Sequence, residues 1–177
     1  MAVQSLAIKY RPQTFEDVTE QANIVSILKH QLSTNTVKNA YLFCGGAGTG
    51  KTTCARIFAK DINNGVGSPI ELDAASNNSV EDIREIITRA KTASIESEYK
   101  VFILDEVHML SNSAWNAMLK LLEEPPIKSI FIMCTTDPQK IPKTILSRVQ
   151  RYNFQRISIG GIVKRLRYII EQENLQE

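Results

Sequence analysis

Short apolar runs alternate along this chain with stretches in which apolar residues recur every three or four positions. The runs predict five buried strands, at residues 40–44, 70–74, 101–104, 130–134 and 152–154. The other stretches predict helices, at residues 21–32, 55–62, 77–91 and 111–126. Strands that alternate with helices predict an α/β domain, with a mostly parallel sheet and helices on both of its faces.

The expected helices carry end signals as well as apolar stripes. Ser79 or a neighbouring asparagine should cap the helix at 77–91, and a serine between Ser111 and Ser113 should cap the helix that Pro125 ends. The stripe residues expected in the core are Ile24, Ile27, Leu28 and Leu32, then Ala55, Phe58, Ala59 and Ile62, then Val80, Ile83, Ile86, Ile87 and Ala90, and finally Trp115, Met118, Leu119 and Leu122.

Composition narrows the class of protein only slightly. The formal net charge of +2 neither requires nor excludes a polyanionic partner. No apolar run has membrane-spanning length, and residues 1–13 lack the apolar core of a signal peptide. Three cysteines, Cys44, Cys54 and Cys134, lie far apart in apolar surroundings. They predict buried thiols in a cytoplasmic protein, rather than a disulfide framework or a zinc site.

A glycine-rich stretch between a predicted strand and a predicted helix matches the P-loop pattern G-x-x-x-x-G-K-[ST]. It consists of Gly45, Gly46, Ala47, Gly48, Thr49, Gly50, Lys51 and Thr52, with Thr53 directly after it. Glycines let successive backbone N–H groups turn toward phosphate oxygens at a helix N-terminus. Lys51 should then face the β- and γ-phosphates of ATP or ADP, and the Thr52 hydroxyl should bind Mg²⁺. The alternative is a glycine-rich turn with a surface lysine.

Two acidic residues end the predicted strand at 101–104. The carboxyl ends of parallel strands form the edge at which α/β sheets bind ligands. Asp105 is therefore the candidate partner of Mg²⁺, and Glu106 the candidate base that polarises an attacking water. Since Glu106 provides a place for water, hydrolysis is favoured over phosphoryl transfer to an organic acceptor. The alternative is a solvated acidic loop.

Six stretches in order carry a resemblance to a known family: KYRPQTFEDV, the P-loop with its flanks, DAASNNSVEDIREI, DEVHMLS with NAMLKLLEEPP, TTDPQKIP, and SRVQRYNF. The chain resembles the gamma/tau family of bacterial DNA polymerase III subunits, the motors of the sliding-clamp loader among the AAA+ ATPases. The resemblance implies a five-stranded parallel sheet in the order 5-1-4-3-2. It also implies an AAA+ nucleotide-binding domain at residues 1–157, and the first helix of a lid domain at 158–177.

The resemblance also implies roles for individual residues. Thr135 and Thr136 would reach the γ-phosphate as sensor 1, unless they are ordinary strand-end threonines. The adenine would be wrapped by Tyr10, Arg11, Pro12 and Val18, although this segment read alone is only an N-terminal arm. Arg148 would act on the ATP of a neighbouring subunit, or else be an exposed charge or a helix-end contact, and no acidic residue lies within four positions of it. Asn77 and Asn78 would face duplex DNA, or simply cap a turn.

Two departures from the family pattern are visible. The gamma/tau pattern has a four-cysteine zinc module where this chain has only NNGVGSP, so no zinc is expected. The sequence ends in a stretch that resembles the first helix of the lid, without the rest of the lid and the collar. This predicts a fragment of a longer protein that is monomeric alone, and the alternative is a naturally short or phage-encoded relative. The implied partners are other clamp-loader subunits (itself, delta and delta-prime), the sliding clamp and primer-template DNA, with no membrane. The function expected is an ATPase motor, and the alternative is an interaction subunit that binds nucleotide without hydrolysing it.

Overall fold

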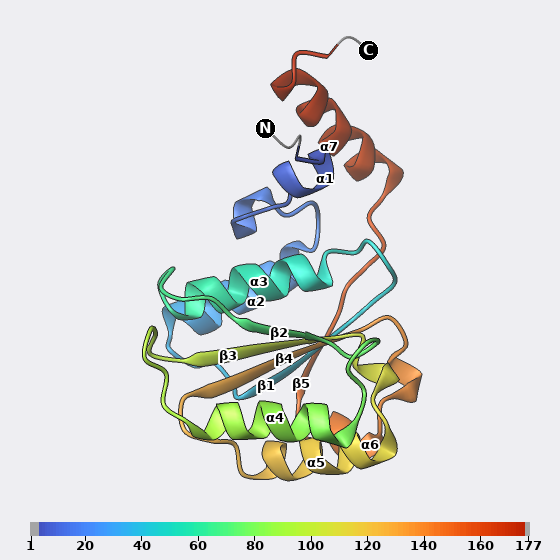
Figure 1. The fold of residues 1–177 in the computed structure, drawn as a ribbon. Coiled ribbons are helices and arrows are strands. Elements are labelled where there is room, and N and C mark those ends of the chain that lie inside the picture. Colours follow the sequence, from blue (N-terminus) through green and yellow to red (C-terminus); the bar gives the residue numbers. More distant parts are fainter. Residues whose placement is uncertain (1–3, 176–177) are drawn as a thin grey trace.

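The computed structural model describes residues 4–175, which form a three-layer α/β domain around a five-stranded sheet (Figure 1). All neighbouring strands are parallel, in the order β2-β3-β4-β1-β5. The strands are β1 (Ala40–Cys44), β2 (Ile70–Asp73), β3 (Lys100–Asp105), β4 (Ser129–Thr135) and β5 (Gln150–Asn153). Counted from the β5 edge, this is the order 5-1-4-3-2, so the expected fold is confirmed.

Helices cover both faces of the sheet. The helices α2 (Ala22–Ser33) and α3 (Lys51–Ile62) lie on one face. The helices α4 (Val80–Lys91), α5 (Asn112–Glu123) and the short α6 (Lys143–Leu146) lie on the other. Beyond α2 and α3, a short helix α1 (Leu6–Lys9) meets the last helix α7 (Ile159–Gln172), as Figure 1 shows. Three 3₁₀ turns complete the described elements: η1 (Phe15–Asp17), η2 (Val107–Met109) and η3 (Pro138–Lys140).

Two hydrophobic cores, one on each face of the sheet, fix the central strands. Every residue of β1 and β4 is buried, because alternate side chains of these strands enter opposite cores. On the α4 and α5 side, Phe102 and Phe131 stack with ring centroids 5.1 Å apart. On the α2 and α3 side, Tyr41 meets Phe58 edge to face, also at 5.1 Å. Burial of one such side chain contributes about 1.5–3 kcal/mol.

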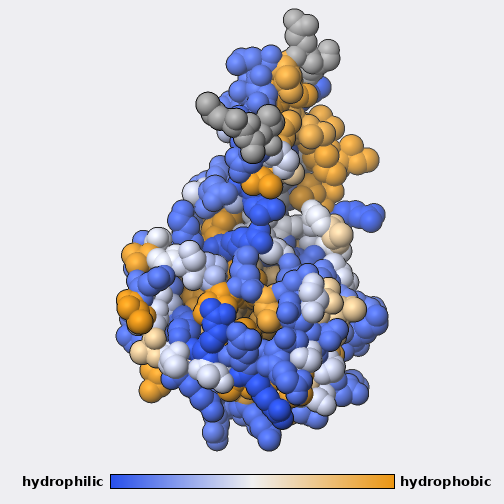
Figure 2. All heavy atoms as spheres, viewed as in Figure 1, coloured by the Kyte–Doolittle hydropathy of each residue, from blue (hydrophilic) through white to orange (hydrophobic). Residues whose placement is uncertain are grey.

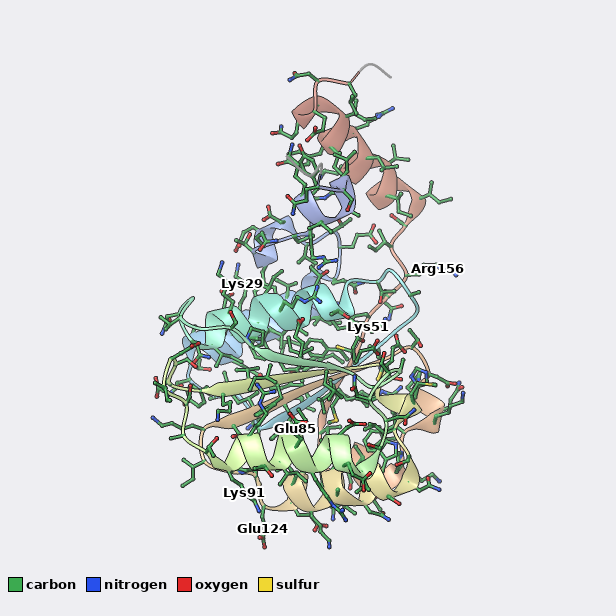
Figure 3. All side chains as sticks on the ribbon, viewed as in Figure 1. Lys29, Lys51, Glu85, Lys91, Glu124 and Arg156 are labelled. Atoms are coloured by element: carbon green, nitrogen blue, oxygen red, sulfur yellow. The ribbon has the colours of Figure 1, made fainter. Side chains whose placement is uncertain are left out.

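The predicted N-terminal caps of the helices α4 and α5 are confirmed. Ser79 caps α4 in a capping box, in which its hydroxyl accepts a hydrogen bond from Asp82 N while the Asp82 carboxylate accepts one from Ser79 N. Ser111 caps α5 by accepting a hydrogen bond from Ala114 N. Charged side chains such as Lys91 and Glu124 point away from the sheet into solvent (Figure 3).

The stripe predicted for α2 is wrong at one position. Ile27 was expected in the core, but it is 44% exposed. The buried residues of α2 are Ile24, Leu28 and Gln31, so the contact line passes beside Ile27. Gln31 is accommodated because its amide bonds to the hydroxyl groups of Tyr41 and Tyr152.

The last helix, α7, buries none of its described residues. It begins at Ile159, close to the expected domain boundary at 157/158, and that boundary stays a prediction. Apolar side chains gather on α7 in Figure 2; those of Ile159, Ile162, Val163 and Leu166 are 40–81% exposed. Within residues 4–175, no helix combines the length and apolar character needed to cross a membrane.

Candidate functional site

The predicted P-loop connects β1 to α3 at the carboxyl edge of the sheet. Gly48 and Gly50 have φ values of +72° and +92°, a left-handed backbone that side chains rarely adopt. A Cβ atom added at Gly46, Gly48 or Gly50 would meet nothing within 4 Å, so the loop surface is open on that side. The helix α3 begins at Lys51, directly after the loop. The loop therefore presents a helix N-terminus, where an anion is stabilised.

Lys51 is buried, and its charge lacks a carboxylate partner. Only 6% of the residue is exposed, and its ammonium donates a hydrogen bond to Gly46 O at 2.7 Å. Within residues 4–175, no carboxylate lies within ion-pair distance of it. A buried cation that has only a neutral carbonyl for a partner is costly unless an anion completes its surroundings.

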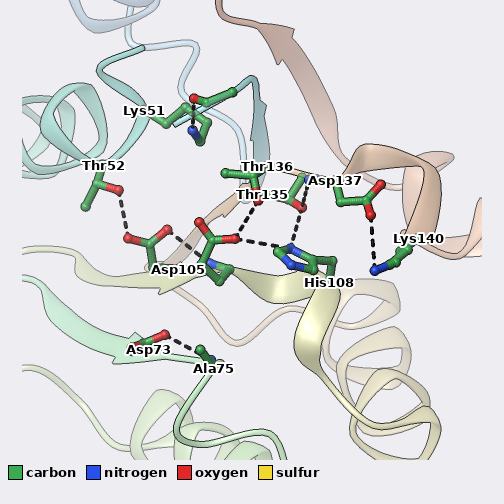
Figure 4. Close-up of polar contacts among 12 residues, drawn as sticks. Lys51, Thr52, Asp73, Ala75, Asp105, His108, Thr135, Thr136, Asp137 and Lys140 are labelled. Carbon is green, nitrogen blue, oxygen red and sulfur yellow. Dashed lines mark hydrogen bonds and ion pairs between the residues drawn. The ribbon is translucent and has the colours of Figure 1, made fainter. Parts of the chain in front are cut away.

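Thr52 and Asp105 meet across the gap between α3 and β3. The Thr52 hydroxyl donates to Asp105 Oδ2 at 2.8 Å, and Asp105 Oδ1 accepts from Glu106 N at 3.0 Å (Figure 4). A hydroxyl and a carboxylate are hard oxygen ligands of the type that Mg²⁺ prefers, alone or through bound water. Together with the anion-binding loop, they fit a magnesium–nucleotide complex.

Glu106 lies in a left-handed conformation, with φ +51° and ψ +44°, at the start of η2. Such backbone strain is common at functional sites. Its carboxylate has two side-chain contacts: the Thr136 hydroxyl donates to Oε2 at 2.9 Å, and His108 Nδ1 lies 3.2 Å from the same oxygen. The candidate base is thus contacted from η2, which follows β3, and from the residue directly after β4.

Thr135 is connected to the Glu106 carboxylate through His108. Its hydroxyl oxygen accepts a hydrogen bond from Asp137 N at 3.0 Å, and it lies 3.0 Å from His108 Nδ1 (Figure 4). The structure therefore brings both predicted threonines to Glu106, one directly and one through the imidazole. Sequence reasoning did not assign a role to His108. The only signal was its place two residues after the acidic pair.

A cavity of about 510 Å³ lies beside the P-loop, between the N-terminal arm and α7. Its size is typical of a small-ligand site. Of the predicted residues it contains Tyr10, Arg11, Pro12, Val18, Gly48, Thr49, Gly50 and Thr53. Residues that the sequence did not indicate complete the walls: Leu6, Ala7, Thr19, Ile157, Arg165, Leu166 and Ile169. Arg165 also joins α7 to the arm by donating to Tyr10 O at 2.6 Å.

Arg148 lies outside this cluster. Its guanidinium donates to Thr144 O at 2.7 Å, to Ser147 Oγ at 3.0 Å and to Glu123 Oε1 at 2.9 Å, all on α5 and around α6. The Arg148 side chain is 34% exposed and that of Glu123 45%, so this ion pair contributes only about 0–1 kcal/mol. The role of Arg148 toward a neighbouring subunit therefore stays a prediction.

The predicted DNA-facing asparagines make local contacts. The Asn77 side chain donates to Asp73 O at 3.1 Å, and Asn78 O accepts from Ser111 N at 3.0 Å. The Asn77 contact fits the capping alternative, whereas the Asn78 contact involves its backbone alone. A role of either residue toward DNA stays a prediction.

The three cysteines are buried, as predicted. Burial raises the pKa of the Cys54 thiol to about 12, and it also raises the pKa values of Cys44 and Cys134. Thiols held protonated in this way are poor zinc ligands and poor nucleophiles.

The purified chain should contain no stoichiometric zinc, because the turn at residues 63–68 offers no thiolate. Among the described residues, no group of three or more His, Cys, Asp and Glu side chains is placed to hold a metal ion. Elemental analysis after dialysis against a chelator checks this expectation. One zinc per chain surviving that treatment would contradict it.

Comparison with known sequences places this chain in a family. The family model described as "DNA polymerase III, delta subunit" matches residues 68–158, slightly more than half of the chain. The chain is 47% identical to DNA polymerase III subunit tau of Bacillus subtilis and 40% identical to that of Escherichia coli, over 99% of its length. It spans about a third of these relatives, 35% and 30% of their lengths.

Solved structures share the fold. The Thermotoga maritima RuvB Holliday junction branch migration motor superposes on 94% of this chain with a TM-score of 0.77 and 18% identity, over 56% of its own length. A DNA polymerase III gamma subunit-related protein from the same organism covers 81% of this chain and 53% of its own, with a TM-score of 0.63 and 20% identity. The fold is that of an AAA+ P-loop protein, and by the match of its sequence the chain belongs to this family of DNA polymerase III subunits.

Proposed function

We propose that this chain is the ATP-binding and ATP-hydrolysing motor module of a DNA polymerase III clamp loader. The observation that carries the proposal is the buried Lys51 ammonium above an open glycine loop. Among residues 4–175, its hydrogen-bond partner is the neutral carbonyl of Gly46. A triphosphate tail supplies the negative charge that this environment lacks.

The proposed division of labour follows from the contacts. The loop residues from Gly45 to Thr53 bind the phosphates, and Thr52 and Asp105 hold Mg²⁺, whose charge would neutralise the phosphate oxygens. Glu106 takes the proton of the attacking water, while Thr136 and His108 orient its carboxylate. The adenine occupies the cavity beside Tyr10, Pro12 and Val18, whose apolar surface suits a flat base.

The proposed partners follow from the family alone. Subunits of the same complex, including further copies of this one, delta and delta-prime, would form a ring that loads the sliding clamp onto primer-template DNA in the cytoplasm. The interaction-subunit alternative keeps nucleotide binding and removes hydrolysis. The presence of Glu106 next to Thr136 and His108 favours the motor.

Replacing Lys51 should weaken nucleotide binding. In Lys51→Ala the phosphates lose a charged donor, so the Kd for ADP with Mg²⁺ should rise at least about tenfold. Isothermal titration calorimetry measures this directly. Lys60→Ala is the matched control, because Lys60 is an exposed lysine on the same helix, away from the loop. If Lys51→Ala binds as tightly as the unchanged chain, the P-loop interpretation fails.

A further inference from the structure

Two consecutive residues before α2 have left-handed backbones that glycine usually provides. Glu20 has φ +61° and Gln21 has φ +57°. Each such conformation costs on the order of 1–2 kcal/mol for a residue with a side chain. The fold therefore retains a strained turn here, and the side chains that the turn places show what it achieves.

The Gln21 amide binds two separate parts of the molecule. Its Nε2 donates to Thr49 O of the P-loop at 3.1 Å and to Gln155 O at 2.6 Å. Its Oε1 accepts from Gln155 N at 3.1 Å. The two carbonyls and the one N–H leave a single orientation of the amide that satisfies all three bonds. Only 9% of Gln21 is exposed, so solvent competes weakly for these bonds.

Gln155 belongs to the linker between β5 and α7, and neighbouring contacts hold the same linker. Phe154 N donates to Cys44 O at 2.7 Å at the start of the P-loop. A Cβ atom at Gly45 would approach Phe154 O to 2.8 Å, which shows how closely loop and linker lie. At the other end, Ser158 N donates to Glu20 Oε2 at 3.0 Å, which fixes the residue that caps α7.

The bond to Thr49 also orients the P-loop backbone. In a trans peptide unit the C=O and the following N–H point in opposite directions. By holding Thr49 O, Gln21 therefore sets the direction of Gly50 N–H, the last loop amide before α3. One amide side chain thus fixes a P-loop peptide and the linker to α7 together.

We infer that Gln21 is a positioning residue that holds the α7 linker in register with the P-loop, so that phosphate binding and the orientation of α7 are coupled. The coupling half of this inference rests on the proposed nucleotide binding, whereas the holding role does not. If the orientation of α7 changes the affinity for nucleotide by some factor, bound nucleotide changes the equilibrium between orientations of α7 by the same factor. Loss of the Gln21 bonds should therefore loosen α7 and weaken nucleotide binding.

Two substitutions separate the amide bonds from general damage. Gln21→Glu keeps the size of the side chain but replaces both donors with carboxylate oxygen, which faces the carbonyls of Thr49 and Gln155. Gln21→Asn keeps an amide and tolerates the left-handed backbone well, but it is one methylene too short to make all three bonds. Gln155→Ala is the control, because Gln21 binds only the backbone of Gln155.

Spin labels at Lys60→Cys on α3 and Glu171→Cys on α7, both exposed positions, report the orientation of α7 by pulsed electron paramagnetic resonance. The native cysteines are at most 2% exposed and do not compete for the label. Without nucleotide, both Gln21 variants should give a distance distribution at least about twice as broad as the unchanged chain and the control. In calorimetry, their Kd for ADP with Mg²⁺ should rise about fivefold or more.

Each result decides a separate point. If the folded variants, checked by cooperative thermal melting, keep the narrow distribution, the inference is wrong while nucleotide binding stands. If the distribution broadens but the Kd for ADP is unchanged, Gln21 holds the linker without coupling it to the P-loop. If the unchanged chain binds no ADP, the proposed function and the coupling fail together, and the width measured without nucleotide still tests the holding role.

Discussion

Glu106→Gln in the assembled clamp loader should bind ATP normally and hydrolyse it about 10²–10⁴ times more slowly. The amide has the size of the carboxylate and still accepts a hydrogen bond from the Thr136 hydroxyl, so the site keeps its geometry. It cannot take a proton from water. Steady-state phosphate release with clamp and primed DNA measures turnover, and calorimetry with ATP measures binding.

Glu124→Gln is the matched control, because Glu124 is an exposed glutamate at the end of α5. Its turnover should equal that of the unchanged protein. A Glu106→Gln assembly that turns over at the full rate would show that another group activates the water. If the unchanged assembly itself releases no phosphate while binding ATP, the interaction-subunit alternative is correct.

Arg148→Ala should leave ATP binding within about twofold and reduce turnover in the assembly by about 10³ or more, as loss of an arginine finger does. The contacts of Arg148 within its own chain lie on α5 and around α6, and its weak pair with Glu123 leaves it available to another anion. Arg151→Ala is the matched control, since Arg151 is an exposed arginine on β5 whose side chain bonds to Asn153.

A mixing experiment tests whether Arg148 acts on a neighbouring subunit. Assemblies made from Arg148→Ala subunits alone or from Lys51→Ala subunits alone should be nearly inactive. Mixed assemblies contain interfaces at which an intact Arg148 faces an intact P-loop, so part of the turnover should return. Mixed assemblies as inactive as each variant alone would overturn the in-trans role, as would a monomeric chain that already hydrolyses ATP at the full rate.

The five strands, the helices α2 to α5 and the candidate phosphate site were predictable from the sequence because their signals are local. The short helices α1 and α6 were not predicted, and α7 was expected only from the resemblance to a family. The glycine spacing before Lys51 indicates a loop whose backbone needs glycine, and the structure has left-handed backbones at Gly48 and Gly50. The apolar run that ends at Asp105 indicates a buried strand and the position of its carboxyl end. The sheet order did not come from such patterns. It came from the resemblance to a family, because strand neighbours depend on contacts between distant segments.

Tertiary structure alone decided which side chains meet. Gln21 reaches Gln155, and Thr136 reaches Glu106, across 134 and 30 positions of the chain. Arg148 has no acidic residue within four positions in the sequence, but in the structure it donates a hydrogen bond to Glu123 at the end of α5. His108 lies beside Glu106 through the local η2 turn, but it meets Thr135 only because β3 and β4 pair.

The same distinction explains the one wrong position in the stripe of α2. Helical periodicity predicts that some face of α2 is buried, but it does not determine how far the contact extends around the helix. Ile27 lies outside that contact, and the polar Gln31 lies inside it because Tyr41 and Tyr152 provide hydrogen-bond partners. Periodicity and backbone requirements are encoded by neighbouring residues, whereas hydrogen-bond partners and the limits of a packed face exist only once distant segments have come together.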